Sequence, residues 1–148
     1  MKKRKIEIMD TTLRDGEQTS GVSFSAAEKL TIAKLLVEEL HVDRIEVASA
    51  RVSEGEFQAV KGITKWAREH GHLDKVEILT FVDGGQSIDW MKRAGATVQN
   101  LLTKGSLNHL IHQLKKTPEQ HFSEIKIAID SAQKEGISTN VYLEDWSN

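Results

Sequence analysis

The chain has 148 residues, of which 39% are hydrophobic and 28% are charged, an ordinary composition for a globular domain. Its formal net charge of -2 leaves no basic surface for nucleic acid, and the absence of cysteine excludes disulfides, thiol nucleophiles and cysteine-based zinc sites. Because it lacks a signal peptide and any apolar run of membrane-spanning length, we expect a cytoplasmic protein without nucleic-acid or membrane partners.

Five short runs rich in β-branched residues are predicted to be strands. They occupy residues 5–9, 44–48, 76–82, 97–102 and 139–144. Longer amphipathic segments separate them, so the chain is expected to form a parallel sheet of right-handed β-α-β units.

The first two helices are predicted from capping signals followed by apolar stripes. Ser25 and Glu28 have the spacing of a capping box, and Ser53 and Glu56 repeat it. The residues that recur at helical spacing, and are therefore expected to be buried, are Leu30, Ala33, Leu36, Val37 and Leu40 in the first helix and Phe57, Val60, Ile63 and Ala67 in the second.

The later helices have equally clear boundaries. A short helix over residues 87–94 should end at Gly95, and another should start at Thr117 and Pro118 and close at Gly136. The expected buried stripes are Leu107, Leu110, Ile111 and Leu114 before that start, and Phe122, Ile125, Ile129 and Ala132 after it.

Two α/β architectures fit this order of elements. One is a five-stranded doubly wound domain, and the other is a partial TIM (β/α)₈ barrel with the first five strands and four helical connections. The sequence ends four residues after Glu144, where a doubly wound domain would need another helix to cover its fifth strand. We therefore expect residues 1–148 to be one domain, the N-terminal portion of a barrel truncated after strand five.

The most polar strand end is the segment 10–18, with the sequence DTTLRDGEQ. Active sites of parallel α/β proteins gather at the carboxyl ends of strands. Arg14 and Asp15 supply a fixed cation and a hard oxygen ligand, which suit a divalent ion or a polarised substrate oxygen, although a salt-bridged surface turn is the alternative. Glu46 lies within an apolar strand and needs a partner, for which Arg14 is the natural choice.

Other polar residues have weaker signals. Glu144, at the end of the fifth predicted strand, is either a candidate base or ligand or part of a solvated chain end. His109 and His112 have a spacing that could bind a metal on one helix face, but an ordinary helix surface is the favoured interpretation. His121 is interpreted as a capping or exposed residue.

Three segments resemble one enzyme family. They are LRDGEQ at residues 13–18 followed by Lys29, DRIEVASAR at residues 43–51, and NVYLEDWSN at residues 140–148. In these segments the sequence resembles the isopropylmalate, homocitrate and citramalate synthases, which belong with hydroxymethylglutaryl-CoA lyase to the DRE-TIM metallolyases. The last two segments are most similar to the bacterial citramalate synthases.

The resemblance implies a TIM barrel that uses a divalent metal (Zn, Mn or Mg) and acetyl-CoA as co-substrate, and that forms a homodimer when full length. The resemblance also implies that the enzyme acts in leucine or isoleucine biosynthesis. The roles that it implies are Asp15 as metal ligand, Arg14, Glu46 and Glu144 in catalysis, and Arg14, Gln18, Leu79, Leu102 and Tyr142 in substrate binding.

Pyruvate, giving citramalate, is the expected 2-oxo acid, because Leu79, Leu102 and Tyr142 would fill space that a branched substrate needs. The alternative is 2-oxoisovalerate, giving isopropylmalate. The His-x-His metal ligands of the family have no counterpart here, so these residues alone are expected to be inactive. Two hypotheses from other functional classes remain. One is a small receiver-like signalling domain, which would need a lysine at the position of Glu144. The other is a non-catalytic partial barrel that binds full-length subunits.

Overall fold

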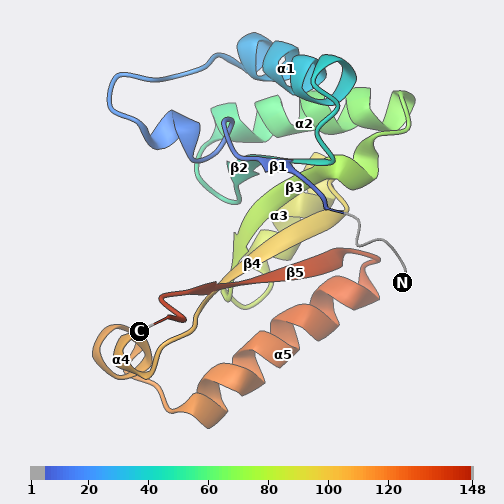
Figure 1. Ribbon diagram of the computed structural model, residues 1–148. Coiled ribbons are helices and arrows are strands. Elements are labelled where there is room, and N and C mark those ends of the chain that lie inside the picture. The colour runs from blue at the N-terminus through green and yellow to red at the C-terminus, as the bar shows by residue number, and fades with distance from the viewer. Residues whose placement is uncertain (1–5, 148) are drawn as a thin grey trace, which may run out of the picture.

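The structure is a computed structural model that describes residues 6–147, and its strands form one parallel sheet (Figure 1). Neighbours in the sheet are also neighbours in the sequence, in the order β1-β2-β3-β4-β5. This order confirms the expected partial barrel, because a doubly wound sheet reverses its strand order partway across. The strands are β1 (Met9–Asp10), β2 (Arg44–Ser49), β3 (Val76–Phe81), β4 (Val98–Lys104) and β5 (Ser138–Glu144).

The helices alternate with the strands and wrap around the outside of the curving sheet (Figure 1). None of the helices within the described residues is long and apolar enough to cross a membrane. The main helices are α1 (Ala26–Lys34), α2 (Glu54–Glu69), α3 (Gln86–Ala94), α4 (Leu107–His109) and α5 (Pro118–Lys134). The short turns are η1 (Gly16–Gln18), η2 (Leu35–Glu39), η3 (Leu73–Lys75) and η4 (Leu110–Leu114).

The core lies between the sheet and the inner faces of these helices. Val60, Ile63 and Ala67 of α2 have no exposed surface, as their spacing predicts, and they lie in one cluster with Ile45 and Ile78 of the strands. Burying an aliphatic side chain of this size contributes about 1.5–3 kcal/mol. The packing of α2 against β2 and β3 therefore sets the orientation of these two strands.

Most of the predicted helix boundaries are confirmed. Ser25 and Glu28 form both bonds of a capping box, and Thr117 caps α5 with Pro118 in its first turn. Gly95 ends α3 in the left-handed conformation, with φ at 77°. The second predicted capping box is only half formed, because the Glu56 carboxylate bonds to Lys29 while its amide donates to Ser53 Oγ.

Two expectations near the N-terminus are wrong in detail. The first strand is confined to Met9–Asp10, and Lys5 lies outside the described residues. As an edge strand it has one neighbour. Just before it, the Ile8 carbonyl accepts from the amides of Asp43 and Arg44, and the Ile8 amide donates to Asp43 Oδ2 at 2.9 Å. Leu40 is 69% exposed, because α1 continues into the π-helical turn η2, whose extra residue per turn rotates Leu40 away from the core.

The helical segments before β5 are less buried than predicted. Leu110 is buried as expected, but three stripe residues are exposed: Leu107, Ile111 and Phe122. Helix α5 presents His121 to the sheet instead of Phe122, and the His121 ring Nε2 lies 3.0 Å from the Lys104 carbonyl oxygen. The expectation that His121 is exposed or capping is therefore wrong.

Candidate active site

The polar segment after β1 folds into a tight turn at the carboxyl end of the sheet. The Thr11 carbonyl accepts hydrogen bonds from the amides of residues 14–16 at 2.8 to 3.2 Å, and Asp10 Oδ1 accepts a backbone amide two residues further on at 2.8 Å. Leu13 is only 1% exposed and anchors the turn in the core. With Leu13 buried, the next side chain, Arg14, is free to turn toward the strand ends.

Arg14 connects two carboxylates. Its Nε donates to Glu46 Oε2 at 2.5 Å, and its Nη1 pairs with Asp15 Oδ1. Glu46 is fully buried and the Asp15 side chain is half exposed. The expected pairing of Glu46 with Arg14 is therefore present in the structure. It holds the guanidinium in place between the interior of the sheet and its rim.

A chain of polar side chains, of which Glu46, Glu77 and Asn100 are buried, continues across the sheet. Asn100 Nδ2 donates to Glu46 Oε1 at 2.6 Å, and Asn140 Nδ2 donates to Asn100 Oδ1 at 2.9 Å. Asn140 also lies 3.2 Å from Glu77 Oε2, and Glu77 Oε1 accepts from Arg44 Nη1 at 3.2 Å. These bonds join β2, β3, β4 and β5 on the concave face of the sheet.

This network was missed by the sequence analysis, although a usable signal was present. Glu77 interrupts an apolar strand, as Glu46 does, and a buried polar group needs a partner. Burial raises the pKa of the Glu77 carboxyl, and the charge of Arg44 and the hydrogen bonds oppose that rise. The same rule that selected Glu46 would have selected Glu77, whereas Asn100 and Asn140 follow other polar residues in their strands and carry no such signal.

Tyr142 shows how strongly the sheet curves. Its hydroxyl on β5 lies 3.1 Å from the Met9 sulfur on β1, although the two residues are 133 positions apart. Burial and the nearby charges of Glu46 and Glu77 raise the pKa of Tyr142 to about 12. The first and fifth strands therefore face each other across the interior.

The three predicted pocket residues lie on that same concave face. Leu102 pairs directly with Tyr142 in the ladder, and Leu79 pairs with Asn100 of the interior network. Because side chains alternate along a strand, Leu102, two positions after Asn100, points to the same side. Leu79 is buried, whereas Leu102 and Tyr142 are partly exposed. The structure thus brings the three together; their role as a substrate wall stays a prediction.

Gln18 lies in the same hollow as Arg14, next to the turn that follows β1. This hollow measures about 340 Å³, and its wall also includes Glu17 and Glu56. Gln18 is exposed, so its side chain is accessible to a small molecule. The substrate-binding role of Gln18 stays a prediction.

Glu144 is not part of the Arg14 cluster. It lies at the exposed carboxyl end of β5, where its carboxylate pairs with Lys104 of β4. Within residues 6–147, no ion pair joins it to Arg14. Its position, two residues beyond Tyr142, puts its side chain on the concave side of the sheet.

Asp15 does not form a complete metal site with the side chains around it. In the part of the chain that the structure describes, no three His, Asp or Glu side chains are grouped closely enough to hold a metal ion, and His109 and His112 belong to no such group. Asp15 offers one carboxylate, already paired with Arg14. Since a transition metal needs several protein ligands, the residues present do not fit a resident metal by themselves.

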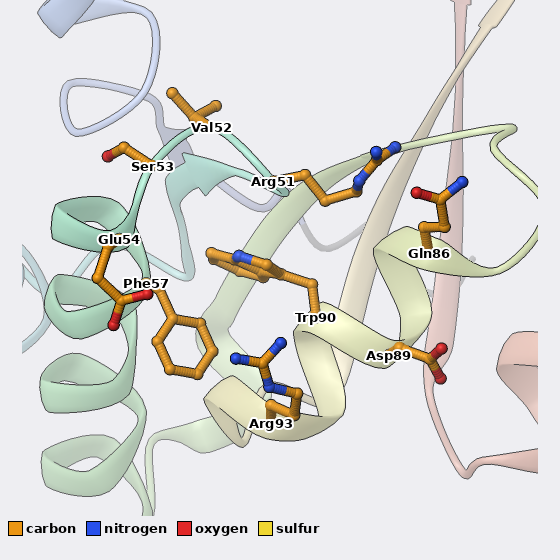
Figure 2. Close-up of a pocket in the computed structure, with 9 residues that line it drawn as sticks. All are labelled: Arg51, Val52, Ser53, Glu54, Phe57, Gln86, Asp89, Trp90 and Arg93. Carbon is orange, nitrogen blue, oxygen red and sulfur yellow. The ribbon is translucent and has the colours of Figure 1, made fainter.

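A second hollow, of about 390 Å³, lies between α2 and α3 and contains none of the predicted site residues. Figure 2 shows Phe57 and Trp90 on its wall, with Arg93 beside Phe57. The two rings meet edge to face at 5.5 Å, and the Arg93 guanidinium lies 4.9 Å from the Phe57 ring centre. These contacts are those of two packed helices, so we assign no chemistry to this hollow.

Comparisons with known proteins are consistent with the geometry. The sequence pattern of the family described as HMGL-like matches residues 5–148. The (R)-citramalate synthase of Methanocaldococcus jannaschii is 37% identical over 141 residues, which are 95% of this chain and 27% of that protein. The 2-isopropylmalate synthase of Pyrococcus furiosus is 39% identical over 131 residues, 88% of this chain and 26% of that protein.

Among solved structures, the HMG-CoA lyase of Bacillus subtilis superimposes with a TM-score of 0.71 at 22% identity, and the match covers 94% of this chain and 46% of the lyase. That likeness concerns the fold alone. The chain spans about a quarter of the length of the synthases that it matches.

Proposed function

Because the chain belongs to the HMGL-like family, we propose that it is the N-terminal part of the catalytic barrel of an acyltransferase that condenses acetyl-CoA with a 2-oxo acid. The activities named for its relatives, citramalate synthase and 2-isopropylmalate synthase, support this class of reaction. The observation that carries the proposal is the Arg14 guanidinium, fixed by buried Glu46 at the carboxyl end of the sheet.

In the proposed reaction Arg14 stabilises the oxygen of the 2-oxo acid that becomes negatively charged. An arginine has five N–H donors, and the contacts with Glu46 and Asp15 use two of them. The others are available to a substrate oxygen. Donors that are held in place before the reaction stabilise developing charge without further reorganisation. Gln18, which lines the same hollow, would contact the substrate.

Glu144 is the proposed base. Its carboxylate would take a proton from the acetyl methyl group, and the resulting enolate carbon would bond to the ketone carbon of the 2-oxo acid. The ketone oxygen would then carry the negative charge beside Arg14 until it takes up a proton and becomes the hydroxyl group of the product. Hydrolysis of the thioester would release CoA.

A divalent metal is part of the proposal, but no step is assigned to it. Asp15 would supply one ligand, and the other ligands would have to come from outside the described residues. Assembly of the full-length enzyme as a homodimer and a cytoplasmic location belong to the same proposal.

We propose pyruvate as the 2-oxo acid, with citramalate as product. The supporting observation is that Leu102 and Tyr142 are direct ladder partners and that Leu79 lies on the adjacent strand, which narrows the space for a branched chain. The second candidate is 2-oxoisovalerate, which the similarity to 2-isopropylmalate synthases favours.

The test is release of free CoA, measured with a thiol reagent, by the native protein isolated from the cell that makes it. Because these residues contain no cysteine, they add no background. We expect turnover with pyruvate and none from residues 1–148 alone. Arg14→Met should lower kcat by about 10²–10³-fold. Exposed Lys61→Met, which also replaces a cation by methionine, is the matched control.

Substrate choice is tested in the same assay. Tyr142→Ala should increase the rate with 2-oxoisovalerate relative to pyruvate, because it opens the wall that Leu102 and Tyr142 form. Unchanged selectivity would refute the assignment of that wall. Turnover that is insensitive to Arg14→Met would refute the proposed mechanism.

A further inference from the structure

Lys29 is the largest fully buried side chain of the described residues, with 1% of its surface exposed. It lies on α1, and its ammonium group contacts two carboxylates, those of Glu17 and Glu56. A lysine is rarely buried unless it is paired, because the desolvated charge is costly. Two carboxylates around one buried ammonium group therefore indicate a specific structural contact.

The contact connects three separate parts of the chain. Glu17 belongs to the turn η1, Lys29 to α1 and Glu56 to α2. Glu17 uses its other oxygen to accept the amide of Phe24 at 2.9 Å, which closes the loop between η1 and α1. Lys29 therefore ties the segment that carries Arg14 and Gln18 to two helices.

Glu56 shows that this contact prevails over a local alternative. Its position three residues after Ser53 suits a capping box, yet its carboxylate bonds to Lys29 and leaves the Ser53 amide to solvent. An exposed amide loses little by bonding to water, whereas an unpaired buried ammonium group would lose much more.

Lys29 also balances the charge of the hollow in which Arg14 lies. Glu17 and Glu56 line this hollow together with Arg14, so the two acids and one arginine carry a net charge of -1. The Lys29 ammonium contacts both acids and offsets one of their two negative charges. The substrates of the proposed reaction are anions, which a net negative wall would repel.

We propose that Lys29 is a positioning residue: it holds the segment from Arg14 to Gln18 in place and partly offsets the negative charge of the two acids of the substrate hollow. The second part of this inference rests on the proposed function. The first part does not, because it concerns the order of the loop.

The loop is tested by hydrogen exchange on the 148-residue chain, with the Phe24 amide as reporter. Lys29→Met should speed its exchange about 10- to 100-fold, since charge-assisted bonds are lost. Lys29→Arg should restore most of the protection, because it keeps the charge. Lys61→Met, at an exposed position on α2, is the matched control and should change nothing. If Lys29→Met does not fold, Glu56→Gln takes its place and should speed exchange several-fold. Unchanged exchange at Phe24 would overturn the proposal.

The charge is tested on the native protein by CoA release. Lys29→Met should raise the KM for the 2-oxo acid and acetyl-CoA more than it lowers kcat, and Lys29→Arg should reverse that rise. Equal KM values in wild type and Lys29→Met would overturn the neutralising role. If wild type releases no CoA, the proposed function fails, while the exchange rates still decide whether Lys29 orders the loop.

Discussion

The replacement Glu46→Gln tests the central contact of the site. Glu46 has no exposed surface, and each of its carboxylate oxygens accepts one hydrogen bond. Oε2 accepts from Arg14 Nε at 2.5 Å, and Oε1 accepts from Asn100 Nδ2 at 2.6 Å. Glutamine has nearly the same volume, so the change removes charge and one acceptor without leaving a cavity.

The expected loss follows from these two bonds. A glutamine can accept from only one of the two donors, and its own amide group then faces the other donor. A hydrogen bond to a charged group contributes about 1.5–3 kcal/mol, and breaking a buried pair by removing one partner costs about 3–5 kcal/mol. We therefore expect Glu46→Gln to lower the free energy of unfolding by about 2–4 kcal/mol.

The measurement is urea unfolding followed by the fluorescence of the buried residues Trp66 and Trp90. A shift of the midpoint with an unchanged slope would report the loss of stability. Glu69→Gln, at an exposed position, should change the stability by less than about 0.5 kcal/mol. A double-mutant cycle with Arg14→Met should give a coupling of about 1–3 kcal/mol. If Glu46→Gln is as stable as Glu69→Gln, the pairing with Arg14 contributes nothing and the reasoning is refuted.

Three further predictions concern other residues. Tyr142 is the only tyrosine, and burial with neighbouring carboxylates raises its pKa from 10.0 to about 12, so absorbance should show ionisation near pH 12. Between pH 10 and pH 12 the folded state keeps the Tyr142 proton while the unfolded chain loses it, so the free energy of unfolding should fall over this range. Tyr142→Phe should remove the part of the fall that comes from Tyr142. An equal fall in wild type and Tyr142→Phe would contradict the prediction. Burial raises the pKa of Glu77, so the charged form of Glu77 weakens the fold. In urea unfolding, Glu77→Gln should therefore lower the free energy of unfolding less at pH 7, where Glu77 is charged, than at pH 4. A larger loss at pH 7 than at pH 4 would contradict the prediction. Gly105→Ala would place a Cβ 2.6 Å from the Trp146 Cβ and should cost about 1–3 kcal/mol, whereas Gly62→Ala in α2 has open space and should gain about 0.5–1 kcal/mol; equal melting temperatures would contradict this.

The fold could be predicted from the sequence wherever two independent signals agreed. For α2 the cap at Ser53 and the stripe of Val60, Ile63 and Ala67 specify the same start and the same buried face. The first helix shows where a single signal fails. Its stripe continues to Leu40 only if the helix keeps its normal period, and the π-helical turn η2 changes that period. No pattern of residues in this segment indicates such a turn.

The position of α5 could not be predicted for a different reason. Periodicity allows either His121 or Phe122 to face the sheet, since they are adjacent on the helix. Hydrophobicity favours Phe122, but the Lys104 carbonyl at the end of β4 provides a hydrogen-bond partner for His121. Such a partner comes from a strand 17 positions earlier, and local sequence does not reveal it.

One contact of the candidate site was predictable from the sequence, and others were not. Arg14 and Glu46 were paired because an acid within an apolar strand requires a cation, and the structure has that pair. Lys29 sits at helical spacing from Ala33 and Leu36, but lysine is usually exposed, so its burial was not expected. It becomes intelligible only when Glu17 and Glu56 are seen on both sides of it.

The floor of the half-barrel, meaning its interior between the strands, and its rim, at the carboxyl ends of the strands, differ in how many of their polar groups have partners within the chain. On the floor, both oxygens of Glu46 are bonded within this chain, and the contact of Tyr142 with Met9 spans the interior from the fifth strand to the first. At the rim, Asp15 is half exposed and Glu144 is exposed and paired with Lys104. The polar groups that position Arg14 therefore have their hydrogen-bond partners within these five strands. Asp15 and Glu144, which would meet a substrate in the proposed reaction, keep exposed surface at this rim.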